Sequence, residues 1–571
     1  MNNHSYTTIA AFNPSDALPI REIGSAPATH QVSNQPPVFE ANLFEIDPAL
    51  KEAIDRAGAS WAQERLLELG AEAGSIEVQH LARQANRFPP ELETHDRFGN
   101  RCDLVFFHPA YHDLMRRAFG AGVHSLAWTE AATGTGHVAR AALNYIWQQA
   151  ENGVCCMTAM AYAAVPTLRK EPRVAAIWEP AVLSTEYDPD LGWIERKRGA
   201  TIGMAMTEKQ GGSDLRANDT RAARLGPTDL GEEYAITGHK WFCSAPMSDA
   251  FLTLAQTDKG ISCFLVPRTL PNGDRNVFRI QRLKDKLGNK SNASCEIEYE
   301  QTRAVLIGEQ GRGIPTILEM AHLTRLDVAI GSAGIMRRAL VEALHHTRNR
   351  RAFQRTLVDQ PLMNTTLADL AIESEAAMTL GLRAAQAVDG SSISPTERRL
   401  ARILVPVAKL WNCKRAPSFV GEALECLGGN GFVETSIMPR LYREAPLNGL
   451  WEGSANVIGL DILRAFRRDP EIIDAVMAEL RISSDHHSSY DALVEGLPDL
   501  LRMALADESI ARRLASNLAL AFQACSLIRF SPNEVSNAFC CSRIDSQNRG
   551  YIFGSFSFPD REAILERAMP R

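Results

Sequence analysis

The sequence lacks the patterns that mark a secreted, membrane or metal-binding protein. Its 11 cysteines include no C-x-x-C couple and its 14 histidines show no zinc spacing, so we expect reduced thiols and no metal site. No run of about 18 apolar residues is present, which argues against a membrane span. The opening residues show no basic start followed by an apolar stretch, which argues against a secretory signal. These absences predict a cytoplasmic protein that does not bind a membrane.

The sequence also has no excess of positive charge. Lys and Arg number 61 against 68 Asp and Glu, a net charge of -7, so any nucleic-acid binding would need a local basic patch. Residues 466–571 hold 12 Lys or Arg against 15 Asp or Glu, and they are not basic either. The sequence has one arginine cluster that could form such a patch. Binding of a flavin phosphate, or simple solvation, explains these arginines as well as nucleic-acid binding does. The members of the cluster are Arg337, Arg338, Arg348, Arg350, Arg351 and Arg355.

What the sequence does contain is a change of periodicity along its length. A chain of 571 residues is too long for a single core. Residues 1–38 read as a loosely ordered lead-in, and the helical spacing of 39–199 gives way to short β-rich runs at 200–307. Long helical segments return at 308–465, and further helices follow at 466–571. We predict an α+β protein with an N-terminal helical domain, a middle β domain, a C-terminal helical bundle and an additional helical domain.

The first candidate site is the segment "GMAMTEKQGGSD", residues 203–214. Glycines such as Gly212 let a backbone approach a ligand closely, and exposed N–H groups suit a phosphate or a flavin oxygen. Thr207 and Ser213 add hydroxyl groups. A turn that binds nothing accounts for the same composition about equally well.

The second candidate is the strand-like segment "TGHKWFCSAP", residues 237–246. A flat ligand that lies against the indole of Trp241, with a hydroxyl at its edge, is one interpretation of this pattern. A half-buried strand that carries one aromatic and one hydroxyl residue is the other.

The third candidate is "RLYREAPLNGLWEGSANVIGLDILR", residues 440–464. Glu452 beside Trp451 is a candidate general base, because an apolar neighbour raises a carboxyl pKa; a glutamate that stabilises a helix N-terminus is the alternative. Ser454 or Asn456 is a candidate cap for a helix that we expect from Val457. A fourth segment, "LGGNGF", lacks the strand-then-helix context of a dinucleotide fingerprint, which leaves a tight loop under a ligand or a plain turn.

Taken together and in this order, these segments resemble the acyl-CoA dehydrogenase family over about residues 40 to 465. "MTEKQGGSD" resembles V-T-E-P-x-A-G-S-D, "ITGHKWFCS" resembles G-x-K-x-W-I-T-N, and "LKDKLGNKSNASCEIEYEQ" resembles the K-x-G-x-R-x-S segment. "RRAFQRTL" resembles R-x-x-F-G-x-x-L, "LGGNGF" resembles G-G-x-G-Y, and "LWEGSANV" resembles Y-E-G-T-x-x-I. The segments "KDKLGNKSNASCE", "PRLYREAP" and "WEGSAN" are similar to the AidB-like branch, bacterial alkylation-response flavoproteins with an additional C-terminal helical domain.

The resemblance implies that the cofactor is FAD. Thr207 and Ser213 would bond the isoalloxazine edge and the pyrophosphate region, and Trp241 would lie against the flavin. Ser244 would supply the hydroxyl that other members place at the position of Cys243. Arg350 would reach the FAD phosphates of a neighbouring subunit, which implies a homo-oligomer and favours a tetramer. The complete implied set is Met206, Thr207, Gly212, Ser213, Trp241, Phe242, Ser244, Arg350, Gly428, Gly429, Trp451, Gly453, Ser454 and Asn456.

The resemblance also implies a reaction. Glu452 takes the place of the base that removes the α-proton of an acyl-CoA while hydride leaves the β-carbon. Trp451 replaces a smaller aromatic, and with Arg464 it would narrow the acyl channel, so ordinary fatty acyl-CoA turnover would be poor. We therefore expect a dehydrogenase for a short, branched or unusual thioester. The alternative is a flavoprotein that binds double-stranded DNA and protects it during alkylation stress.

Overall fold

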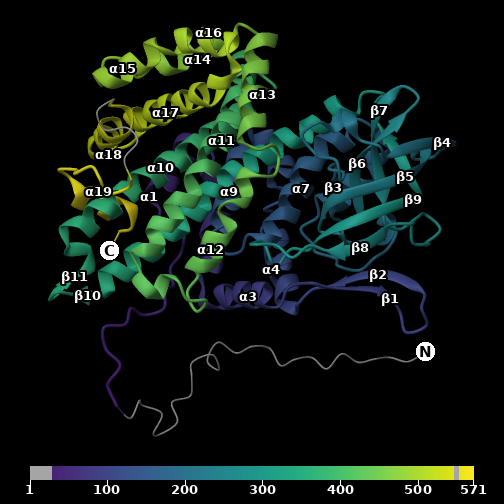
Figure 1. The fold of residues 1–571 in the computed structure, drawn as a ribbon, viewed down its shortest axis with the longest axis horizontal. Helices are drawn as coiled ribbons and strands as arrows, with labels where there is room; N and C mark the ends of the chain where they lie inside the picture. Colours follow the sequence, from purple (N-terminus) through teal and green to yellow (C-terminus); the bar gives the residue numbers. More distant parts are fainter. Residues whose placement is uncertain (1–28, 546–551, 571) are drawn as a thin grey trace.

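The structure, a computed structural model, describes residues 29–545 and 552–570. Helices gather in one body, and a β domain lies beside it (Figure 1). This arrangement confirms the predicted α+β class, with helical N- and C-terminal parts and a β domain in the middle of the chain. The predicted lead-in, residues 1–38, lies mostly outside the described residues.

The N-terminal part of the chain is built around two interior helices, α6 and α7. Both have buried residues on nearly all sides, which is typical of helices surrounded by other elements. The helices of this part are α1 (Pro48–Arg56), α2 (Gln63–Gly74), α3 (Ile76–Arg87), α4 (Pro109–Gly120), α5 (Leu126–Thr129), α6 (Gly136–Trp147), α7 (Gly153–Leu168) and α8 (Pro172–Val182).

One element of this part differs from the prediction. The spacing predicts helix throughout 39–199, whereas the chain forms an antiparallel hairpin of β1 (Glu91–His95) and β2 (Arg101–Phe106). An isolated hairpin is marginal in water, but this one is bound to the β domain. Arg101 donates to the Ile280 carbonyl at 2.8 Å, and Asp103 accepts from the Ile280 N–H at 3.2 Å.

The β domain is a sheet that closes on itself. Its strands are β3 (Ile202–Ala205), β4 (Arg221–Thr228), β5 (Gly231–Ser244), β6 (Ala250–Thr257), β7 (Gly260–Pro267), β8 (Arg279–Leu283) and β9 (Ser294–Ile307). They follow the order β3-β6-β4-β5-β9-β7, and β6 also pairs with β7, so five strands form a ring around an aromatic-rich core. The antiparallel pairing of β5 with β9 sets Ser244 opposite Ser294.

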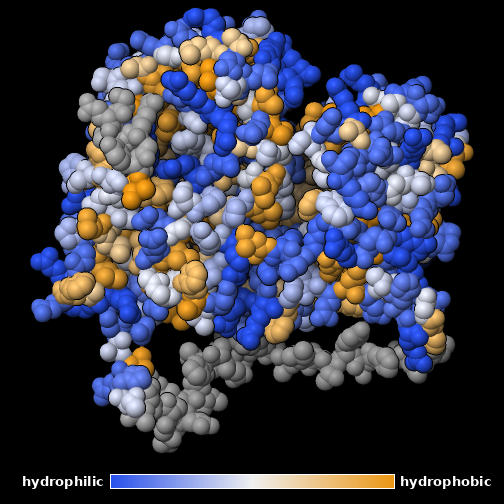
Figure 2. Space-filling model, viewed as in Figure 1, coloured by the Kyte–Doolittle hydropathy of each residue, from blue (hydrophilic) through white to orange (hydrophobic). Residues whose placement is uncertain are grey.

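Long helices form the C-terminal bundle. They are α9 (Gly313–Asn349), α10 (Pro361–Gly390), α11 (Pro395–Glu425), α12 (Met438–Glu444) and α13 (Ala455–Arg468), with a small hairpin of β10 (Arg351–Ala352) and β11 (Arg355–Thr356) between α9 and α10. Helix α7 packs against both β3 and α9, and thereby lies at the junction of the β domain with the bundle. Apolar side chains gather near the middle of the face in Figure 2, whereas hydrophilic side chains predominate over the β domain.

The last part of the chain packs onto this bundle (Figure 1). Arg543 contacts Glu373 of α10 at 2.9 Å, and Arg567 contacts Glu375 of α10 at 3.0 Å and Glu52 of α1 at 2.7 Å. Among the described helices, none combines the length and the apolar character that a membrane crossing requires. The helices of this part are α14 (Ile472–Arg481), α15 (Ser488–Glu495), α16 (Leu497–Ala506), α17 (Ala511–Phe530), α18 (Asn533–Phe539) and α19 (Arg561–Ala568).

Candidate active site

Glu452 lies in a tight turn immediately before α13. Its backbone φ is +60° and that of Gly453 is +100°, so two successive residues adopt the left-handed region. This conformation costs a non-glycine residue roughly 1–2 kcal/mol. Contacts from other elements must therefore hold the turn in place.

Two cations supply those contacts. Arg325 of α9 donates from Nε to the Glu452 carbonyl at 3.0 Å, and Lys409 of α11 donates from Nζ to the Gly453 carbonyl. Consecutive carbonyl groups of the turn are thus each bound by a positively charged side chain from a different helix.

The indole of Trp451 is held by a buried polar chain. Its Nε1 donates to Asn448 Oδ1 at 3.0 Å, and Asn448 Nδ2 donates to Ser332 Oγ at 3.2 Å. Ser332 in turn donates to the Cys413 sulfur at 3.3 Å. These bonds fix the ring that precedes Glu452 against α9 and α11.

Arg464 belongs to a charged group on α13. It contacts Asp461 at 3.2 Å, and its side chain is 55% exposed. Asp461 also binds Arg325 at 3.0 Å and Arg402 at 2.8 Å. The role of Arg464 with Trp451 in narrowing an acyl channel stays a prediction.

The carboxyl group of Glu452 is set up to exchange a proton. Burial raises its pKa, and the Thr324 hydroxyl and the charges of Arg325 and Lys409 oppose that rise. Its Oε2 atom is buried and has no hydrogen-bond partner among the described residues. A carboxylate with a raised pKa and a free oxygen is suited to general-base chemistry.

At the end of β5, Cys243 and Ser244 point to opposite faces. Cys243 is fully buried in the core of the β domain, whereas Ser244 Oγ lies 3.1 Å from Ser294 Oγ and bonds toward the thiol of Cys156 on α7. Alternation along a strand requires this arrangement. Of the two candidates for a ligand-facing side chain, the structure turns Ser244 toward the helices.

Trp241 and Phe242 carry a cation on their rings. Lys284 Nζ lies 3.7 Å from the Trp241 ring centroid and 4.5 Å from that of Phe242, which is half exposed. The backbone N–H of Trp241 donates to the Thr207 carbonyl at 2.8 Å, which joins β5 to the segment after β3. This contact brings the first and second predicted segments together.

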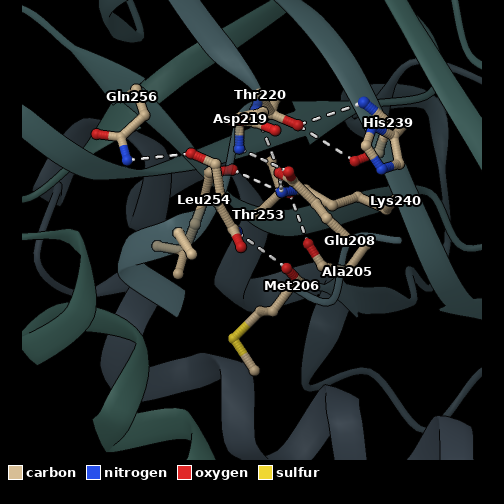
Figure 3. A network of polar contacts seen from close by, with 12 residues as sticks. Ala205, Met206, Glu208, Asp219, Thr220, His239, Lys240, Thr253, Leu254 and Gln256 are labelled. Atoms are coloured by element: carbon tan, nitrogen blue, oxygen red, sulfur yellow. Dashed lines mark hydrogen bonds and ion pairs between the residues drawn. The ribbon is translucent and has the colours of Figure 1, made fainter. Parts of the chain in front are cut away.

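A buried ion pair holds the segment after β3 against the sheet (Figure 3). Glu208 binds Lys240 Nζ at 2.7 Å with both side chains fully buried, and it accepts the backbone N–H of Asp219 at 2.7 Å. Lys240 also donates to the Leu254 carbonyl at 2.9 Å. Burial alone would raise the pKa of Glu208, but Lys240 and the other donors outweigh it and hold that pKa at about 2.

The remaining residues of this segment are placed by close packing. Met206 accepts from Asn218 Nδ2 at 3.0 Å through its carbonyl. A Cβ on Gly212 would lie 2.3 Å from Thr207 Oγ1, so only glycine fits there without a shift. Ser213 follows on the exposed side of the loop.

Cys156, in the first turns of α7, lies where the two halves of the site meet. Its buried thiol has Ser244 and Asn292 as hydrogen-bond partners, and the charges of Lys286 and Glu452 act on it. Burial raises the pKa of Cys156 to about 11. The end of β5 and the segment before β9 therefore meet at this helix, within reach of the charge of Glu452.

Sequence reasoning missed Cys156 and Lys286. Lys286 donates to Ser294 Oγ at 3.1 Å and to the Asn292 carbonyl at 2.5 Å, and it thereby extends the row of polar groups that begins at Ser244. Lys286 lies inside the segment "LKDKLGNKSNASCEIEYEQ", so its place in a family motif was the available signal.

A hollow of about 460 Å³ lies apart from the Glu452 turn and is lined by Arg350, Gly428, Gly429 and His346, among other residues. A Cβ on either glycine would meet no atom within 4 Å, so their backbone is open to a ligand. None of the residues that line this hollow is among those that surround Glu452. The predicted cofactor residues therefore fall into two groups.

Helix α13 begins at Ala455, two residues before the predicted start. Ser454 occupies the capping position, but its side chain makes no capping hydrogen bond, and Asn456 is exposed in the first turn. The first N–H groups of α13 are thus free of a side-chain cap.

The predicted basic patch does not form one surface. Arg337 and Arg338 are buried, with Arg337 bound to Asp47 at 3.1 Å and Arg338 bound to Glu342 at 2.6 Å. Both charges therefore lie in the interior of the structure. Neither can belong to a basic patch on the surface.

Comparison with known proteins identifies the family. The family model "Adaptive response protein AidB N-terminal domain" matches residues 34–189. The models "Acyl-CoA dehydrogenase, middle domain" and "Acyl-CoA dehydrogenase, C-terminal domain" match 203–302 and 311–466. The Escherichia coli (strain K12) protein AidB is 42% identical over 521 residues, which cover 91% of this chain and 95% of that protein. The chain belongs to the acyl-CoA dehydrogenase family, in its AidB branch.

Other members of the acyl-CoA dehydrogenase family share the architecture. Acyl-CoA dehydrogenase family member 11 of Caenorhabditis elegans is 28% identical over 95% of this chain and 92% of its own length. The crystal structure of Caenorhabditis elegans ACDH-11 in complex with C11-CoA superimposes with a TM-score of 0.82 over 91% of this chain and 94% of that one. An acyl-CoA dehydrogenase complexed with FAD, from Bacillus anthracis, has the same fold at 15% identity, with a TM-score of 0.62 over 93% and 89% of the two chains.

Proposed function

We propose that this protein is an FAD-dependent oxidoreductase of acyl-CoA thioesters, in which Glu452 removes the α-proton. The observation that carries the proposal is the buried, unpartnered Oε2 of Glu452 in a carboxyl group whose pKa burial raises. Cys156 of α7 is a hydrogen-bond partner of Ser244, and the charge of the Glu452 carboxyl group acts on its thiol.

The residues present fit a flavin. Ser244 directs a hydroxyl toward the helices, Trp241 offers a flat ring at the edge of β5, and the open backbone of Gly428 and Gly429 lies in the hollow of Arg350, where phosphates suit a guanidinium. The backbone of Trp241 binds the segment after β3, which contains Met206, Thr207, Gly212 and Ser213. We assign Gly453, Ser454 and Asn456 to the cofactor as well, because the N–H groups at the start of α13 have no side-chain cap.

The reaction divides between the cofactor and this chain. FAD, when bound, accepts the hydride that leaves the β-carbon of the thioester. Glu452 takes the α-proton on its free oxygen, while Arg325 and Lys409 hold the turn that aims the carboxyl group. We assign Trp451, whose indole is held by Asn448, to the wall of the acyl pocket beside Glu452. The preferred acyl group is therefore short, branched or otherwise unusual.

The acyl-CoA class is supported by a relative, since ACDH-11 of Caenorhabditis elegans was crystallised with C11-CoA. We further infer a homo-oligomer, with a tetramer as the favoured form. Arg350 lines an open hollow, and Phe353 at the tip of the β10–β11 hairpin is 94% exposed, as a side chain that a neighbouring subunit covers would be.

The visible absorption spectrum of the purified protein tests this proposal. The spectrum is recorded before and after anaerobic addition of a panel of acyl-CoA thioesters with straight, branched and short acyl groups. We expect a flavin band that at least one thioester bleaches. A flavin band that none of them bleaches would contradict the dehydrogenase function.

Duplex DNA binding remains a prediction of the family resemblance. The burial of Arg337 and Arg338 leaves fewer exposed charges in the arginine cluster between Arg337 and Arg355. If DNA is bound through phosphates, the affinity must fall steeply as salt rises, and a flat salt response would exclude that mode.

A further inference from the structure

Lys409 is a buried cation that contacts no carboxylate among the described residues. It is 1% exposed on α11, and its Nζ donates to the Gly453 carbonyl. Removal of an ammonium group from water is unfavourable, and a paired carboxylate is the usual group that offsets the cost. A lysine in this state needs a specific explanation.

Two other lysines with almost no exposed side chain show the usual solution. Lys240 contacts Glu208 at 2.7 Å, and Lys197 contacts Asp249 at 3.0 Å. Lys409 differs from both because its ammonium group donates to a backbone carbonyl, that of Gly453, in the turn that contains Glu452.

The charge that faces Lys409 comes from that same turn. Burial lowers the pKa of Lys409, and the Cys413 thiol and the Glu452 carboxylate both act to raise it. The carboxylate is therefore near enough to favour the charged lysine, although no ion-pair contact joins them. The oxygen of Glu452 that such a contact would occupy stays free.

We propose that Lys409 is a positioning residue for proton abstraction: it holds the Gly453 carbonyl so that the left-handed turn aims Glu452, and its charge stabilises the ionised carboxylate without binding it. This inference rests on the proposed role of Glu452 as the base. A direct ion pair would make the carboxylate a weak base, as Glu208 shows with its pKa of about 2. Lys409 binds the Gly453 carbonyl and not the carboxylate, so its charge stabilises the carboxylate without preventing Glu452 from accepting a proton.

Few other groups face Glu452. Thr324 and Arg325 come from α9, and Cys156 comes from α7. Arg325 binds the Glu452 carbonyl independently of Lys409, so a Lys409 variant removes one of the two cations that hold the turn. The carboxyl group should then lose part of the stabilisation of its charged form.

The test compares three variants of the FAD-loaded protein. Lys409→Met removes both the charge and the donor, Lys409→Gln keeps a donor without the charge, and Lys409→Arg keeps both. The protonation of Glu452 is followed against pH by difference infrared absorption of its carboxyl group, with Glu452→Gln as the assignment control. The measurement needs no turnover.

We expect the Glu452 titration to move to higher pH in Lys409→Met and Lys409→Gln, with at least a tenfold change in the protonation constant, and to stay near the wild type in Lys409→Arg. If Lys409→Met does not fold, Lys409→Gln gives the same answer on charge. An unchanged titration in a variant without the charge would overturn the proposal.

The rate of flavin reduction supplies the second readout. With any thioester that bleaches the flavin, we expect the acid limb of the pH–rate profile to move in the same direction and the FAD content to stay unchanged. If no thioester reduces the flavin, the proposed function fails, while the infrared titration still decides the role of Lys409.

Discussion

Glu208 and Glu452 are two glutamates with fully or partly buried side chains, each near a buried lysine, yet the structure gives them opposite properties. Glu208 contacts Lys240 at 2.7 Å and accepts backbone N–H groups, and its pKa is held at about 2. Glu452 keeps a free buried oxygen, its lysine binds a neighbouring carbonyl, and its pKa is raised.

The position of the lysine, and not its presence alone, decides whether the pKa of the buried glutamate is lowered or raised. Burial acts on both carboxyl groups in the same direction. Direct contact and several N–H donors reverse the effect at Glu208, which makes it a structural anion. Lys409 binds a backbone carbonyl instead of the carboxylate, so the pKa of Glu452 stays raised and the carboxylate can accept a proton.

The largest effect should come from the replacement of the free carboxyl group. Glu452→Gln should retain FAD but lower the rate of flavin reduction by about 10²–10⁴-fold, the usual contribution of a general base. Anaerobic stopped-flow absorbance with a reducing thioester measures this rate. Reduction at the wild-type rate would remove Glu452 from the role of base.

The matched change at the paired glutamate should act on stability instead. Glu208→Gln leaves Lys240 buried without its carboxylate and should lower the free energy of unfolding by roughly 3–5 kcal/mol. Chemical denaturation measures this loss, and Glu452→Gln is the control with the same change of side chain. If Glu208→Gln is as stable as that control, the ion pair does not have the structural role described here.

The smallest effects should appear in the pH dependence of stability. The depressed pKa of Glu208 means that its contribution is complete above its ordinary pKa of 4.5 and is lost as the pH falls toward about 2. The raised pKa of Glu452 has the opposite sign, so its contribution is complete below pH 4.5 and is lost as the pH rises through the raised value. Glu452→Gln should therefore gain stability relative to the wild type from pH 4 to pH 8. Denaturation curves across that range would contradict this if the difference stayed constant.

Much of this site could be predicted from the sequence because its motifs are local. Trp241, Ser244 and Glu452 each lie in a short segment with a recognisable neighbour pattern. Side-chain direction was less accessible, because that pattern did not show that Cys243 is buried in the β domain whereas Ser244 points toward Cys156 of α7.

The contacts that tune the site could not be predicted in this way. Lys409 and Arg325 lie far from Glu452 in the sequence, and on long helices their spacing looks like that of ordinary residues. Only tertiary packing shows that they bind successive carbonyls of one turn. The β1–β2 hairpin was missed for a related reason, since it is bound to the β domain through Ile280, which the helical spacing on either side of it does not reveal.

The most direct test of the central claim is to titrate both glutamates in one experiment. Difference infrared absorption from pH 3 to pH 9, with Glu452→Gln and Glu208→Gln to assign the two carboxyl bands, follows each proton separately. The account predicts that Glu208 stays ionised to the lowest pH and that Glu452 takes up its proton above the ordinary pKa of a glutamate. Two carboxyl groups that titrate together near that ordinary value would contradict it.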